Sequence, residues 1–143
     1  MEFALVAPLL ILLVMGVISY GYMLSFRQAL SQGAAEGARA AAVSPYPAAA
    51  DKQAAGLAAL NEALDAYGVS CDGVAVGSHL KKNSVNVGTC AVTTTPCSND
   101  ATKDCVTAAL NYLYQDHPLT PKFPGVGLVL PENLAYDAVA RIS

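Results

Sequence analysis

The chain has 143 residues, enough for about one domain, and 54% of them are hydrophobic. Its net charge of −3 argues against a dedicated nucleic-acid-binding protein, which would need a basic patch to neutralise phosphates. The apolar residues are unevenly distributed. No charged residue occurs from Phe3 to Phe26, and every lysine and arginine lies at Arg27 or beyond.

The uncharged stretch predicts a membrane helix. The hydrocarbon of a bilayer is about 30 Å thick, and a helix of about 20 apolar residues spans it. The segment from Phe3 to Leu24 reaches this length. A buried core helix this long would need more partner core than the rest of the chain can supply. A signal peptide would have a basic start and a shorter apolar region, whereas this chain begins Met1-Glu2. The sequence therefore favours insertion into a membrane.

The same helix is predicted to continue to about residue 42, because residues 29–42 are rich in alanine. Apolar residues recur there at spacings of three and four, which is typical of one helix face. They are Leu30, Ala34, Ala38 and Ala41. About 40 residues at 1.5 Å each span about 60 Å, so half of the helix stands outside the bilayer. Pro45 and Pro47 are expected to end it.

Four residues of this helix stand out. Pro8 removes a backbone hydrogen bond and is expected to kink or loosen the helix, although an ordinary membrane-helix proline accounts for it equally well. Gly33 and Gly37 form a small-xxx-small pair, which favours close approach of another helix. Glu2 lies at the edge of the apolar stretch, where a carboxylate is costly unless it has a partner or interfacial exposure.

The remainder, residues 44–143, predicts a globular α+β domain. A second helix is expected at about residues 47–67, with Leu57, Leu60 and Leu64 on one face and Gly68 as its cap. Alternating apolar residues predict strands at about residues 84–92, 105–114 and 134–142. A rigid loop with several prolines, among them Pro124, is expected between the last two strands. We therefore predict two helices packed on a small antiparallel sheet.

The four cysteines predict two disulfides and an extracytoplasmic domain. They lie in the C-terminal half without a C-x₂-C pair, which disfavours zinc: Cys71, Cys90, Cys97 and Cys105. Three pairings are open; we prefer Cys97–Cys105, clamping a hairpin tip, and Cys71–Cys90. Arg27 and Arg39 after the apolar span by themselves favour a cytoplasmic location, a conflict that a lost basic leader would remove.

The sequence predicts neither an enzyme nor a bound cofactor or metal. It contains no nucleophile elbow, zinc-protease motif or phosphate loop. His79, Lys81 and Lys82 are interpreted as a solvated loop. Asn99, Asp100 and Asp104 lack the spacing of a calcium loop and are expected at a polar hairpin tip.

The segments Glu2-Phe3-Ala4-Leu5-Val6-Ala7-Pro8-Leu9-Leu10 and Ala34-Ala35-Glu36-Gly37-Ala38-Arg39-Ala40 resemble the TadE-like pilins of tight-adherence (Tad) pili, which are type IV-like systems. The stretch from Leu119 to Ile142 also resembles the end of that family. The resemblance implies a pilin-like fold and a prepilin that a membrane-embedded peptidase cleaves. It also implies extraction from the inner membrane by an assembly ATPase and platform.

In related pilins, a glutamate near the mature N-terminus neutralises the terminal amine of a neighbouring subunit, and Glu2 matches that position. The glutamate is normally fifth after cleavage but second here. We therefore expect Met1 to be a misassigned start, with the leader and first mature residues missing.

From these observations we expect a structural subunit that stacks its apolar helix with other copies or related pilins in an extracellular filament. The residues expected to act in assembly are Glu2, Phe3, Pro8, Gly33 and Gly37. Either a major or a minor subunit fits. The alternative is a permanently membrane-anchored periplasmic binding or scaffolding module that never polymerises.

Overall fold

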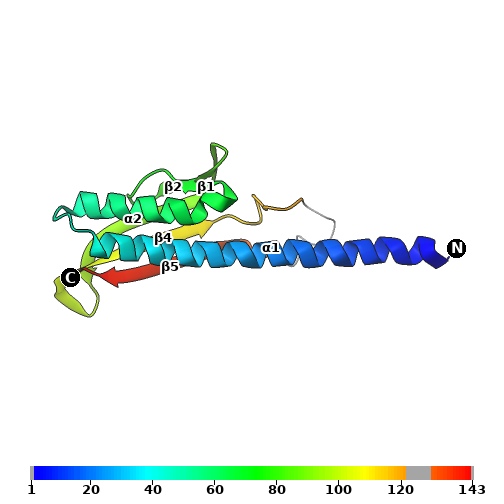
Figure 1. The fold of residues 1–143 in the computed structure, drawn as a ribbon, viewed down its shortest axis with the longest axis horizontal. Coiled ribbons are helices and arrows are strands. Elements are labelled where there is room, and N and C mark those ends of the chain that lie inside the picture. The colour runs from blue at the N-terminus through cyan, green and yellow to red at the C-terminus, as the bar shows by residue number, and fades with distance from the viewer. Residues whose placement is uncertain (1, 122–129, 143) are drawn as a thin grey trace.

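The structure, a computed structural model, describes residues 2–121 and 130–142, without the side chain of Glu2. One long helix, α1 (Glu2–Val43), forms a rod whose first half projects away from a globular domain (Figure 1). The domain consists of the second half of α1, a second helix and a five-stranded sheet. This arrangement confirms the predicted fold class. The predicted proline-rich loop lies partly outside the described residues, since Pro124 falls in the gap.

The helix α1 is continuous over 42 residues and is therefore about 63 Å long. It runs through Pro8 without interruption, so the expected loosening does not break the helix. Its last residue is Val43, directly before the segment that contains Pro45 and Pro47. A single rigid element thus belongs both to the projecting rod and to the domain.

The second helix, α2 (Ala49–Leu64), lies beside the second half of α1 and is extended by the short 3-10 helix η1 (Asp65–Tyr67). Its predicted apolar face is turned inward, with Leu60 and Leu64 fully buried. Gly68 ends the segment with φ of 64°, the left-handed conformation that glycine adopts without strain. The helix thus covers the sheet with the face that its sequence predicts.

The five strands form one antiparallel sheet in the order β1-β2-β3-β4-β5. They are β1 (Val69–Cys71), β2 (Ser78–Lys82), β3 (Val85–Cys97), β4 (Asp100–Tyr112) and β5 (Leu134–Arg141). Both helices cover the same face: α1 packs on β4 and β5, and α2 packs on β1 and β3. The opposite face, which we call the outer face, carries no helix in the described part of the chain.

The sheet is larger than predicted. The strands β1 and β2 were missed, and the segment with His79, Lys81 and Lys82 lies in β2, so its interpretation as a loop was wrong. Lys81 instead forms an ion pair with Asp72 at 2.9 Å. The central hairpin of β3 and β4 also extends further toward its tip than predicted, and this tip lies between Cys97 and Asp100, far from the N-terminus (Figure 1).

Two disulfides hold the sheet, and both preferred pairings are confirmed. Cys71–Cys90 joins β1 to β3. Cys97–Cys105 closes the distal part of the β3–β4 hairpin. All four cysteines of the chain are therefore paired, and each is buried. The first disulfide thus lies in the core beneath α2, and the second lies near the tip of the central hairpin.

Candidate functional site

The projecting part of α1, which we call the stem (Phe3–Tyr22), is the most unusual surface of the molecule. Phe3 is 91% exposed and Leu5 is 82% exposed. In all, twelve large apolar side chains from Phe3 to Ile18 are exposed, with these two included. Contact with the domain begins only at Ser19 and Met23, which are buried. Soluble proteins rarely leave an apolar surface of this extent open to water.

The stem is apolar on every side. The consecutive residues from Leu9 to Leu13 are all exposed, although they point in different directions around the helix axis. A helix with this pattern belongs in a large protein core or in a membrane. Twenty residues rise about 30 Å, the thickness of bilayer hydrocarbon. By length and composition, the helix that contains the stem is able to cross a membrane.

An aromatic cluster, which we call the neck, joins the stem to the domain. Its members come from α1, η1, the end of β4 and the turn that follows it: Tyr22, Phe26, Tyr67, Tyr112 and Tyr114. The ring of Phe26 is fully buried, with its centroid 4.8 Å from that of Tyr112 and 5.0 Å from that of Tyr67. Pairs of rings at these separations stabilise a core beyond their buried area. The neck therefore fixes the direction in which the stem leaves the domain.

Burial raises the pKa of two tyrosines in the neck. The pKa of Tyr112 is raised to about 12, mainly because burial disfavours the phenolate. Burial raises the pKa of Tyr114 in the same way. The hydroxyl of Tyr112 donates a hydrogen bond to the carbonyl oxygen of His117 at 2.8 Å. Burial in the neck thus favours the neutral form of the Tyr112 and Tyr114 phenols.

Two polar contacts lie at the rim of the neck. The hydroxyls of Ser25 and Tyr67 are 2.6 Å apart. On the side of β5, Arg27 Nε donates a hydrogen bond to the hydroxyl of Tyr136 at 2.7 Å. Arg27 is the first charged residue after the stem. These contacts place polar groups where the apolar surface ends.

The residues expected to act in assembly do not gather at one place. Phe3 and Pro8 lie exposed on the stem, and the side chain of Glu2 is outside the described part. Gly33 and Gly37 are buried and face α2 of the same chain. A Cβ added at Gly37 would lie 3.1 Å from the carbonyl oxygen of Gly56. The close helix approach predicted from these glycines is thus made within the subunit, and their part in assembly stays a prediction.

Gly56 is the residue that the sequence reasoning missed. It lies in the middle of α2, where a glycine costs about 1 kcal/mol relative to alanine and so signals a packing constraint. A Cβ on Gly56 would come 2.7 Å from the carbonyl oxygen of Gly37 and 2.9 Å from Ala41 Cβ. The two helices therefore cross with their backbones in contact at this glycine pair.

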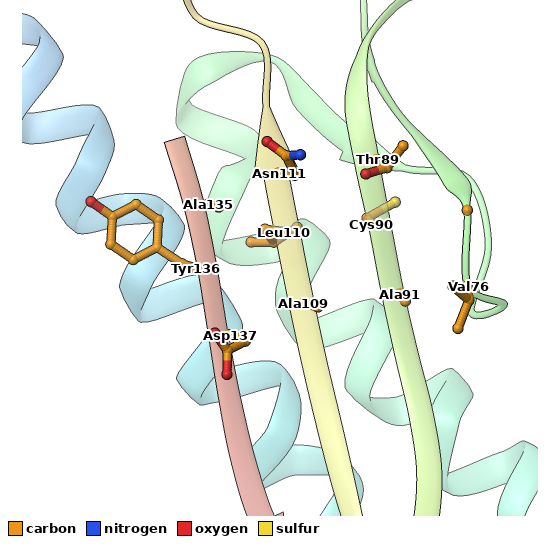
Figure 2. A pocket seen from close by; sticks show the side chains of 11 residues that line it. Val76, Thr89, Cys90, Ala91, Ala109, Leu110, Asn111, Ala135, Tyr136 and Asp137 are labelled. Atoms are coloured by element: carbon orange, nitrogen blue, oxygen red, sulfur yellow. The ribbon is translucent and has the colours of Figure 1, made fainter. Parts of the chain in front are cut away.

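The outer face of the sheet has a shallow depression of about 250 Å³, between β5 and the loop that carries Val76 (Figure 2). Its floor consists of small side chains from three strands, Ala91, Ala109 and Ala135. Asn111 Oδ1 is buried there without a hydrogen-bond partner, and Asp137 supplies the one carboxylate of the lining. Within the described residues no group of three or more metal-ligating side chains gathers.

A family model matches the N-terminal part of the chain, which contains the stem. Residues 1–39 match the model of a protein family, TadE, described as TadE-like protein. The match covers the stem and most of the rest of α1, and it is the family that the N-terminal residues resemble. The resemblance of the segment from Leu119 to Ile142 stays a prediction. No curated protein and no solved structure matches the chain.

Proposed function

We propose that this chain, a Tad pilus-associated protein by the match of its first 39 residues, is a structural pilin-like subunit that polymerises through its stem. Before assembly the stem spans the inner membrane, and the disulfide-bonded domain lies on the extracytoplasmic side. During assembly the stem leaves the lipid and joins the stems of other copies or related pilins. The domain then forms the outside of the filament, and no reaction chemistry is required of it.

The observation that carries the proposal is the exposure of the stem on all sides. Burial of one large apolar side chain stabilises by about 1.5–3 kcal/mol. Twelve such side chains are exposed between Phe3 and Ile18. Transfer of the stem from lipid to water would therefore cost on the order of 20 kcal/mol. The stem can leave the membrane only for another dry environment, and a bundle of equivalent stems supplies one.

The residues expected to act in assembly have different roles in this proposal. Glu2 neutralises the terminal amine of a neighbouring subunit, while Phe3 and Pro8 contribute to the stem–stem contact. Gly33 and Gly37 act indirectly, because they hold α2 against α1 and so keep the outward face of α1 free for neighbours. A prepilin peptidase, an assembly ATPase and a platform process and extract the chain.

Accessibility of engineered thiols tests the proposal, because the four native cysteines are all in disulfides. We would express Ile11→Cys, on the stem, and Val76→Cys, on the domain, in cells that assemble the pilus. Both positions are exposed in the isolated subunit, by 56% and 84% respectively. Fibres sheared from the cells would then be treated with a hydrophilic maleimide in the absence of membrane.

We expect the chain in the sheared fibres, with Val76→Cys labelled and Ile11→Cys protected by neighbouring stems until the fibres are dissociated in detergent. Equal labelling of the two thiols in intact fibres would contradict the stem contact. Recovery of the chain only from the membrane fraction would show the permanently anchored module instead.

A further inference from the structure

Arg27 lies at a defined height above the apolar surface. It follows Tyr22, the last residue of the stem, by five residues, which is about 7–8 Å along the helix axis. A bilayer is about 30 Å thick in its hydrocarbon and about 40–45 Å with its headgroups, so each headgroup layer is about 5–8 Å deep. When the stem fills the hydrocarbon, the guanidinium of Arg27 therefore lies among the lipid phosphates.

A residue of the domain, Tyr136, holds the side chain of Arg27. Its Nε donates to the hydroxyl of Tyr136 at 2.7 Å, and Figure 2 shows the Tyr136 ring directed from β5 toward α1. Arg27 is exposed, and no carboxylate of the described residues forms an ion pair with it. Arg39, the next arginine on α1, differs because it pairs with Glu36 at 3.3 Å. One nitrogen of Arg27 is thus fixed while its terminal nitrogens have no anionic partner there.

Tyrosines surround this height of the helix, as expected at a membrane–water boundary. Tyr20 lies two turns before Arg27 on the same helix face and is 49% exposed. Tyr22 is 42% exposed on another face and contacts Tyr67 edge to face, at a ring separation of 5.8 Å. Phenol rings prefer the headgroup region, so they hold the stem at the depth that places Arg27 at the phosphates.

We propose that Arg27, held by Tyr136, binds the phosphate of an anionic phospholipid in the leaflet next to the domain. A guanidinium binds a phosphate through two parallel hydrogen bonds, which a lysine cannot reproduce. The inference rests on the membrane stage of the proposed function. The net charge of −3 gives the chain no overall electrostatic attraction to an anionic membrane. A preference for an anionic lipid would therefore come from the local site at Arg27.

The test measures lipid retained by the full chain. Wild type, Arg27→Gln, Tyr136→Phe and the control Arg39→Gln would be purified in detergent and titrated with phosphatidylglycerol or phosphatidylcholine, with bound lipid counted by native mass spectrometry. Since a charged hydrogen-bonded pair contributes about 1.5–3 kcal/mol, we expect phosphatidylglycerol affinity to fall about tenfold or more in Arg27→Gln. Tyr136→Phe should weaken binding in part, and Arg39→Gln should bind as wild type does.

Unchanged phosphatidylglycerol binding in Arg27→Gln, or an equal loss in Arg39→Gln, would overturn the inference. Displacement of the lipid by millimolar inorganic phosphate would show a soluble anion site instead. Matching circular dichroism spectra would exclude misfolding of the variants. The fibre experiment is independent, since a chain absent from fibres that still prefers phosphatidylglycerol would refute the filament role and leave this site standing.

Discussion

The crossing of α1 and α2 predicts that two glycine-to-alanine substitutions in helices have opposite effects on stability. In an unconstrained helix interior, either change stabilises by about 1 kcal/mol through helix propensity. At Gly56, however, the new methyl would lie 2.7 Å from the Gly37 carbonyl oxygen, 2.9 Å from Ala41 Cβ and 3.0 Å from Val92 Cγ1. Overpacking of this kind costs about 1–3 kcal/mol, and the neighbours are backbone and core atoms that cannot move aside cheaply.

Gly33→Ala is the matched control. A Cβ there would meet Ala63 Cβ at 3.5 Å and Leu64 Cδ2 at 3.6 Å, which is ordinary van der Waals contact. We therefore expect Gly33→Ala to stabilise by about 1 kcal/mol and Gly56→Ala to destabilise by about 1–2 kcal/mol. For a domain of this size, each kcal/mol shifts the unfolding midpoint by roughly 4–8 °C.

The assay is thermal unfolding of the full chain in one detergent, followed by near-ultraviolet circular dichroism of the tyrosines in the core. Opposite shifts of the two midpoints would support direct backbone contact between the helices. A rise of the midpoint in both variants would refute the reasoning, because α2 would then lie too far from α1 for Gly56 to be needed.

Two further predictions concern the sheet and the neck. Replacing both Cys71 and Cys90, which are 19 residues apart, with alanine should cost about 3 kcal/mol, measured as a lower urea midpoint without any reducing agent; an unchanged midpoint would contradict this. The pKa of Tyr112 is raised to about 12, from about 10 in the unfolded chain. The contribution of its neutral phenol to the free energy of unfolding is therefore complete below pH 10 and is lost as the pH rises toward 12. Urea unfolding should show a steeper loss over this range in wild type than in Tyr112→Phe, and equal slopes would contradict the assignment.

The long helix and the disulfides could be predicted because each depends on a strong local signal. An uncharged run from Phe3 to Phe26 followed by alanine-rich turns leaves few alternatives to a helix. The cysteine pairing followed from placing Cys97 and Cys105 on either side of a hairpin tip. The sheet then brings Thr95 opposite Cys105 in register, so the chain is already close there.

The missed strands have weak sequence patterns for a physical reason. In β2 only Leu80 is buried, so no run of alternating apolar residues marks Ser78–Lys82 as a strand. The hairpin extension around Thr93–Thr95 is likewise polar, because it projects where the helices cover it less. These segments are strands because of tertiary pairing with β3 and β4, which local sequence does not report.

The partner of Gly33 and Gly37 could not be predicted for a different reason. A small-xxx-small pattern reports that a helix approaches closely, but it is the same whether that helix belongs to this chain or to another one. Only the place of Gly56 in the fold decides between the two. The signal was present in α2 as a glycine within an alanine-rich helix.

The continuity of α1 has a mechanical consequence. The strand β5 runs in the same direction as α1 and packs along it, and α2 lies beside it over the same stretch (Figure 1). Tension applied to the N-terminal end is therefore carried lengthwise into these contacts, so that they are loaded together in shear and not peeled apart one after another. The domain is therefore expected to resist unfolding when force is applied through the stem.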